Sequence, residues 1–160
     1  MVLEKGNTMM KKRWLVGIFA AVLCLQACGD KEYKPREIDS ETDICKICNM
    51  TIVHKEYAGE IALKNGDYEI FDDLGCLIEY MKGMDEDDLG KAFIKDESGK
   101  KWLDVKTASY VYDKDIWTPM SYGVIAFQTK EEAKKYIEKE GKGKLLSFSD
   151  LDTFEWGVHH

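Results

Sequence analysis

Proline is scarce in this sequence, with two residues among 160, and its 23 basic residues are outnumbered by 30 acidic ones. So few prolines, with only thirteen glycines, exclude collagen-like and low-complexity chains. A net charge of −7 argues against nucleic-acid binding, which requires a basic face to neutralise phosphates. The hydrophobic residues make up 44% of the chain, which is enough for one or two small domains with a buried core.

No apolar run is long enough to span a bilayer comfortably. The longest, residues 14–25, has the length of a signal-peptide core and follows three basic residues, Lys11-Lys12-Arg13. It ends in Leu25-Gln26-Ala27-Cys28, which resembles the bacterial lipobox, where cleavage leaves a lipid-bearing cysteine at the new N-terminus. We therefore expect residues 1–27 to be a lipoprotein signal peptide and Cys28 to carry the lipid.

The residues that follow are polar and lack apolar periodicity. We expect residues 28–43, which include Pro35, to form a tether between the lipid and the folded part. Removal of residues 1–27 takes away four basic residues and one acidic residue, so the net charge changes from −7 to −10. The mature protein is expected on the outer face of the bacterial cytoplasmic membrane, or on the periplasmic side of a membrane.

Strand and helix patterns begin after the tether. Residues 57–63 and 68–71 flank Asn65-Gly66, a sequence typical of a hairpin turn. Apolar residues then recur at helical spacing from Leu74 to Met81, with Asp72 or Asp73 as the N-cap and Gly83 as the end. Residues 92–94 predict a third strand.

A similar pattern returns later in the chain. Residues 123–127 predict a strand, Thr129 a helix cap and residues 130–140 a helix, with residues 145–148 as the last strand. Trp102-Leu103 and residues 109–112 are expected to be strands of this second unit. An offset of 56 residues aligns the two strand-helix junctions. The sequence therefore predicts an α+β fold of two ββαβ-like units, residues 44–100 and 101–156.

Three cysteines of the exported part carry the candidate chemistry. Cys45, Cys48 and Cys76 are an odd number in a compartment where cysteines usually pair. The run Cys45-Lys46-Ile47-Cys48-Asn49-Met50 offers two thiolates and a thioether, and His54 follows. Such a loop could wrap one metal ion.

Other interpretations compete with this one. Haem attachment is excluded, because Asn49 stands where it requires histidine. A redox pair of Cys45 and Cys48, a structural disulfide from Cys45 to Cys48 or Cys76, and a zinc site of these three cysteines with His54 all remain open.

Methionine separates the candidate metals, because a thioether is a poor ligand for zinc and a good one for Cu(I). Met50 lies in the cysteine run, and Met120 lies in a turn-rich segment before a strand. Met81 and Met84 lie on the predicted helix or at its end, where core packing is the better interpretation. Met50 and Met120 together favour copper.

These motifs resemble those of the NosL family of nitrous oxide reductase accessory lipoproteins, which bind copper. The resemblance runs in order through most of the mature chain. Asn49 stands where the family commonly has glycine, and asparagine tolerates a left-handed backbone. The blocks that carry it are Cys45-x-x-Cys48-Asn49-Met50, Phe71-Asp72-Asp73-Leu74-Gly75-Cys76, Ala108-Ser109-Tyr110-Val111, Trp117-Thr118-Pro119-Met120 and Ala126-Phe127.

The resemblance implies a lipid-anchored Cu(I) carrier that supplies nitrous oxide reductase and docks on the Nos copper-maturation proteins. The sequence shows no serine, cysteine or carboxylate catalytic set with its partners, so we expect no enzymatic activity, and we expect a monomer or a weak dimer. It also implies two ββαβ units, similar to organomercurial lyase. The ligands carried over are Cys48, Met50 and Met120, with Cys45 and Cys76 as plausible ligands or thiol partners. Asp72 and Asp73 are interpreted as helix caps. The alternative function is an exported thiol-disulfide oxidoreductase that uses Cys45 and Cys48, with Cys76 as the resolving thiol.

Overall fold

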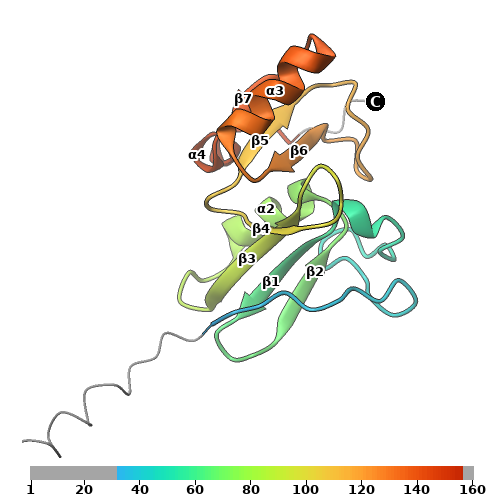
Figure 1. Ribbon diagram of the computed structural model, residues 1–160. Coiled ribbons are helices and arrows are strands. Elements are labelled where there is room, and N and C mark those ends of the chain that lie inside the picture. Colours follow the sequence, from blue (N-terminus) through green and yellow to red (C-terminus); the bar gives the residue numbers. More distant parts are fainter. Residues whose placement is uncertain (1–31, 157–160) are drawn as a thin grey trace, which may run out of the picture. The chain divides into compact units, whose positions relative to one another are not determined.

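A computed structural model describes residues 32–156 of the protein (Figure 1). The expected signal peptide, residues 1–27, and the expected lipidated Cys28 lie outside the described residues. No helix within residues 32–156 combines the length and apolar character that crossing a membrane requires. The elements are η2 (Lys55–Tyr57), β1 (Gly59–Leu63), β2 (Tyr68–Phe71), α2 (Leu74–Gly83), β3 (Leu89–Lys95), β4 (Trp102–Asp104), β5 (Ser109–Tyr112), β6 (Val124–Phe127), α3 (Lys130–Glu140), β7 (Lys144–Leu146) and α4 (Phe148–Asp152).

The strands form two antiparallel sheets with the same core topology (Figure 1). The order is β2-β1-β3-β4 in the first sheet and β6-β5-β7 in the second. In each sheet the first strand of the unit is central, the second and third flank it, and one helix connects these two. The predicted α+β fold of two ββαβ units is thus confirmed, with β4 as an additional edge strand.

The two strand-helix junctions also match in their side chains. In the first unit, the rings of Phe71 and Tyr80 lie with centroids 5.3 Å apart at an interplanar angle of 48°. In the second, Phe127 and Tyr136 lie 5.2 Å apart at 51°. Both pairs join the end of a strand to the helix that follows it, and the predicted offset of 56 residues relates them.

The helix caps occupy equivalent positions. Asp73 caps α2, because its carboxylate accepts the backbone N–H of Gly75 at 3.0 Å. Thr129 caps α3 in a capping box with Glu132, in which each side chain accepts the other residue's backbone N–H. Both caps were predicted, and each fixes where its helix begins.

Three details of the predicted secondary structure are wrong. Trp102 and Leu103 belong to the first sheet, because the turn 96–101 returns the chain antiparallel to β3, where Leu103 pairs with Ile94. Ser147 ends β7 and starts α4, since its N–H donates to the Asp150 carboxylate at 2.7 Å. Tyr57 closes a 3-10 turn before the first strand.

The expected tether of residues 28–43 is wrong from Tyr33 onward, because the Tyr33 ring lies against Gly90 of β3 and the Lys34 carbonyl accepts the Tyr68 hydroxyl at 3.4 Å. The N–H of Arg36 donates to the Glu60 carboxylate at 2.9 Å, and Ile38 is buried. The Arg36 guanidinium pairs with Asp43 at 2.6 Å. These contacts cover the face of β1 that carries Glu60. Without them the Glu60 carboxylate would be exposed to solvent.

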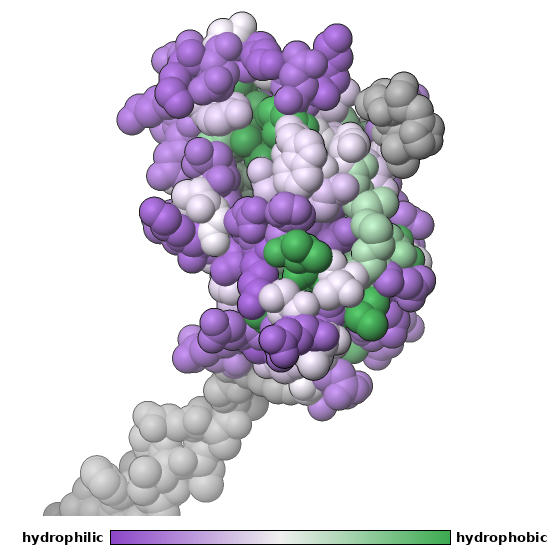
Figure 2. All heavy atoms as spheres, turned by 90° about the vertical axis from the view of Figure 1, so that its right-hand side faces the viewer, coloured by the Kyte–Doolittle hydropathy of each residue, from purple (hydrophilic) through white to green (hydrophobic). Residues whose placement is uncertain are grey.

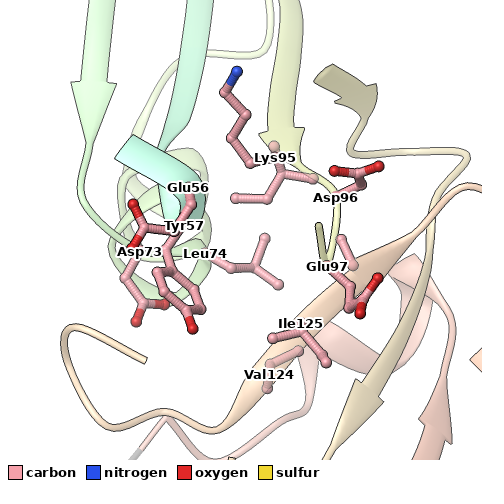
Figure 3. Close-up of a pocket in the computed structure, with 11 residues that line it drawn as sticks. Glu56, Tyr57, Asp73, Leu74, Lys95, Asp96, Glu97, Val124 and Ile125 are labelled. Atoms are coloured by element: carbon pink, nitrogen blue, oxygen red, sulfur yellow. The ribbon is translucent and has the colours of Figure 1, made fainter. Parts of the chain in front are cut away.

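Helix α2 lies at the centre of the core, where it packs against β1 and β2 of the first sheet and against β6 of the second. Leu74, Cys76, Leu77 and Ile78 are its buried side chains in the main hydrophobic cluster. Where α2 meets β6, a cavity of about 10 Å³ has room for one water molecule (Figure 3). The two units therefore share one core at this helix.

Glu60 generates a stability prediction. Its side chain is fully buried, and burial raises its pKa from 4.5 to about 7. Because Glu60 ionises at lower pH in the unfolded chain, its contribution to the free energy of unfolding should be fully present below pH 4.5 and be lost as pH rises through 7. Replacement with Glu60→Gln removes this charge, so the variant should be about 2–3 kcal/mol more stable than wild type at pH 8.

Urea unfolding of both proteins at pH 5 and pH 8 tests this prediction. The difference between them should be small at pH 5 and grow toward pH 8. A difference in the free energy of unfolding that does not change with pH would show that burial does not raise the pKa of Glu60.

Candidate metal centre

Cys45–Met50 form a tight turn, here called the knuckle. The N–H of Cys45 donates to the Met50 carbonyl at 2.8 Å, and the N–H of Asn49 donates to the Cys45 carbonyl at 3.0 Å. Asn49 has a φ of 59°, in the left-handed region, as expected for the residue that stands in place of glycine. The backbone thus turns back on itself with both cysteine side chains in one turn.

The knuckle is fastened to the end of β2. The N–H of Lys46 donates to the carbonyl of Ile70 at 2.9 Å. Two residues after Ile70 comes Asp72, and the first turn of α2 then carries Cys76. The thiols of Cys45, Cys48 and Cys76 and the carboxylate of Asp72 therefore gather, with their ligand atoms all within 4.8 Å of one another. We call these four residues the sulfur cluster.

The sulfur cluster is largely closed to solvent. Cys45 and Cys76 are fully buried and Asp72 nearly so, whereas Cys48 is half-buried, and all three cysteines are free thiols. The Cys48 thiol donates to Asp72 Oδ2 at 3.4 Å. Asp72 Oδ1 is buried without a hydrogen-bond partner. An unpaired buried acceptor is costly, so this oxygen is suited to a proton donor or a cation.

Hydrogen bonds distribute the protons among the thiols. The Cys76 thiol and the backbone N–H groups of Cys48 and Asp72 donate to Cys45, which lowers the pKa of Cys45 to about 6 despite its burial. The pKa of Cys76 is raised by the same hydrogen bond and by burial. Burial raises the pKa of Cys48 to about 12. Hydrogen bonds thus favour the thiolate at Cys45, and burial favours the protonated thiol at Cys48 and Cys76.

The zinc set proposed from sequence is not assembled. His54 lies outside the cluster, with its ring centroid 4.8 Å from that of Trp117 and its Nδ1 3.2 Å from a Glu56 oxygen. Asp72 takes the fourth place in its stead. Its interpretation as a helix cap is wrong, because Asp73 caps α2. The spacing of four residues between Asp72 and Cys76 could have indicated that the two side chains lie together. Asp72 was instead interpreted as a cap because it stands next to Asp73.

Both methionines of interest lie on the segments around the cluster. Met50 ends the knuckle and is 46% exposed. Met120 is half-buried in the loop 113–123, and its N–H donates to Asp73 Oδ2 at 3.2 Å. This hydrogen bond places Met120 next to the residues that connect Asp72 to Cys76. Their roles as ligands stay predictions.

The loop 113–123 connects β5 to β6 in the second unit, where the first unit has the short turn 64–67. The Thr118 hydroxyl accepts the N–H groups of Tyr122 and Gly123 at 3.1 and 3.3 Å. The Tyr122 ring lies against Gly75, where a Cβ atom would be 2.2 Å from the ring. Glycine at position 75 is thus what lets the second unit's loop approach the start of α2.

Comparison with known proteins agrees with this geometry. A family model for NosL matches residues 35–155. The chain belongs to the NosL family. Its fold is similar to the crystal structure of the copper chaperone NosL from Shewanella denitrificans, with a TM-score of 0.64 and 22% sequence identity. The match covers 75% of this chain and 96% of that one, and at this identity it shows the fold. No curated protein matches the chain.

Within this NosL protein, two glycines of α2 provide a matched pair of substitutions. Gly75→Ala places a methyl group inside the Tyr122 ring, so it should destabilise the protein by about 1–3 kcal/mol. Gly83→Ala meets no atom within 4 Å and should be neutral, or stabilising by up to about 1 kcal/mol. Urea unfolding measures both, and equal effects would contradict the close approach of the loop.

Proposed function

We propose that this protein is a copper metallochaperone that binds one Cu(I) ion at the sulfur cluster and passes it to another protein. The observation that carries the proposal is the gathering of three free cysteines from the knuckle and α2 within 4.8 Å. The NosL family, and the description of the Shewanella structure as a copper chaperone, support it. Thiolate and thioether ligands together are better suited to Cu(I), a soft monovalent cation, than to zinc.

We assign Cys48, Met50 and Met120 as the Cu(I) ligands. The Cys48 sulfur provides the anionic ligand and the two thioethers provide neutral ones, so the ion and these three ligands together carry no net charge. Cys48 must lose its proton to solvent to bind, and in the absence of the ion its thiol donates to Asp72 Oδ2 at 3.4 Å. Cys45 and Cys76 lie deeper and hydrogen-bond to each other, which makes them further ligands or thiol partners of the bound ion.

Ligand exchange explains how such a site would release copper. Cu(I) is stable with two or three soft ligands, so an incoming sulfur can add before a bound one leaves. Cys48 is the half-buried member of the cluster, and Met50 is exposed beside it. Transfer would therefore proceed at this side and requires no oxidation of the protein.

The cellular setting belongs to the same proposal. The protein would be held at the outer face of the bacterial cytoplasmic membrane, or on the periplasmic side of a membrane, by a lipid on Cys28. It would act as a carrier and not as an enzyme. Its proposed recipients are the Nos copper-maturation proteins and, through them, nitrous oxide reductase.

Anaerobic titration with Cu(I) against a chromophoric chelator tests the proposed site. Wild type should bind one equivalent, and Cys48→Ser, Met50→Ala and Met120→Ala should each lower the affinity about tenfold or more, the loss of a soft ligand. Met84→Ala is the control, because this thioether lies at the end of α2 and packs against the core. No binding by wild type beyond the background of a control protein would contradict the carrier and favour the dithiol oxidoreductase instead.

Proton release on Cu(I) binding follows from the pKa values of the cluster. At pH 7.5 Cys45, with a pKa of about 6, is already ionised, whereas Cys48, with a pKa of about 12, is protonated. Binding should thus release about one proton per Cu(I), from Cys48. Below pH 6 Cys45 also holds a proton. The number of protons released per Cu(I) should therefore rise there if both Cys45 and Cys48 bind the ion.

A weakly buffered solution with a pH indicator measures this release. In the Cys48→Ser variant, saturated with Cu(I) at the same pH, the release should disappear. Release of no protons by wild type would contradict the assignment of a protonated Cys48 as a ligand.

A further inference from the structure

Four large apolar side chains are exposed near the sulfur cluster. Among the described residues, five large hydrophobic side chains are exposed, and one of them, Tyr68, belongs to β2. The other four, here called the apolar rim, are Ile44 (57% exposed), Met50 (46%), Val53 (69%) and Trp117 (55%).

The apolar rim is built from both units. Ile44 and Met50 belong to the two sides of the knuckle hairpin, which is closed by the bridge between Ile44 and Thr51, and Val53 follows directly. Trp117 comes from the loop 113–123, and its ring meets those of His54 and Tyr57 edge-on, at 4.8 and 5.4 Å. These contacts hold the Trp117 ring beside the knuckle while more than half of the residue stays in solvent.

The apolar rim lies at the accessible side of the cluster. Cys45 and Cys76 are fully buried, and Cys48, on the same turn as Met50, is the thiol that solvent reaches. The segment after the knuckle lies on the right of Figure 1, and Figure 2 turns that side toward the viewer, where apolar groups stand among hydrophilic ones. A partner that covers this surface would also meet Cys48, the thiol that solvent reaches.

Concentration of exposed apolar groups at one site is typical of an interaction surface. Charge narrows the choice of partner. The described residues carry ten more acidic than basic side chains. A second copy of the chain would bring an equal negative charge, and anionic lipid headgroups would be repelled as well. A protein with basic side chains around an apolar contact is complementary to a chain of this net charge.

We propose that the apolar rim is the docking surface for a copper-accepting protein that presents an apolar contact with a basic margin and its own sulfur ligand. This inference rests on the proposed copper-carrier function. Docking on Ile44, Val53 and Trp117 would bring the partner's ligand to Cys48 and Met50. The ion would then pass through ligand exchange without release into solvent.

Site-specific photo-cross-linking of the full chain in its host tests the contact. A photoreactive amino acid replaces Val53 in one protein and Tyr68 in the control, since Tyr68 is also exposed but hydrogen-bonds to the Lys34 carbonyl at the N-terminal segment. A defined protein adduct should form from position 53 and not from position 68. Adducts with lipid, with a second copy, at both positions or at neither would overturn the proposal.

Transfer kinetics then test whether the captured protein is the acceptor. The purified partner receives Cu(I) from wild type, Val53→Asp or Tyr68→Asp, each loaded with one equivalent. Val53→Asp should slow the transfer roughly tenfold or more, and added salt should slow the wild-type transfer by screening opposite charges. Tyr68→Asp should transfer at the wild-type rate, and a Val53→Asp rate equal to wild type would overturn the proposal.

The copper affinity of each variant separates the two proposals. Val53→Asp should keep the wild-type Cu(I) affinity within about twofold, because Val53 is not a ligand. If wild type itself fails to bind Cu(I), the carrier function fails whatever the cross-links show. If all three proteins bind Cu(I) and Val53→Asp transfers normally, only the docking surface fails.

Discussion

The buried carboxylate of Asp73 connects the parts of the molecule that the site needs. It caps α2 through the N–H of Gly75, and through the N–H of Met120 it holds the second unit's loop. Its pKa is raised by burial, although the donors around it favour the charged form. The start of α2, the position of Cys76 and the position of the loop 113–123 thus all depend on the Asp73 side chain. Loss of this link would leave the three thiols in the first unit and separate Met120 from them.

The internal repeat does not reproduce the sulfur cluster in the second unit. Two backbone hydrogen bonds of the turn 96–101 resemble those of the knuckle, because Asp96 N–H donates to the Lys101 carbonyl at 2.9 Å and Glu97 N–H donates to the Ala126 carbonyl at 2.8 Å. At the offset of 56 residues, Glu132 occupies the position of Cys76 and completes a capping box. At this position the second unit therefore has a carboxylate where the first has a thiol, and the second unit contributes the loop 113–123.

Local signals predicted the elements well. The periodicity of 74–81 and 130–140, the caps Asp73 and Thr129 and the left-handed Asn49 are decided by neighbours in the sequence, and the structure confirms them. The placement of β4 was missed because strand partners are chosen by tertiary contacts that a three-residue strand does not encode. Asp72 was missed for a related reason, since its partner Cys48 is 24 residues away. The packed segment after Tyr33 resembled a tether because its ordering contacts, such as Arg36 with Glu60, are also distant in sequence.

The central claim is that the sulfur cluster and the nearby methionines hold one Cu(I). X-ray absorption spectroscopy at the copper edge, on the protein loaded with one equivalent, tests it most directly. We predict a Cu(I) edge and a first shell of two or three sulfur atoms, with one fewer sulfur in Met120→Ala. A shell dominated by nitrogen or oxygen, or a spectrum unchanged by Cys48→Ser, would contradict the account.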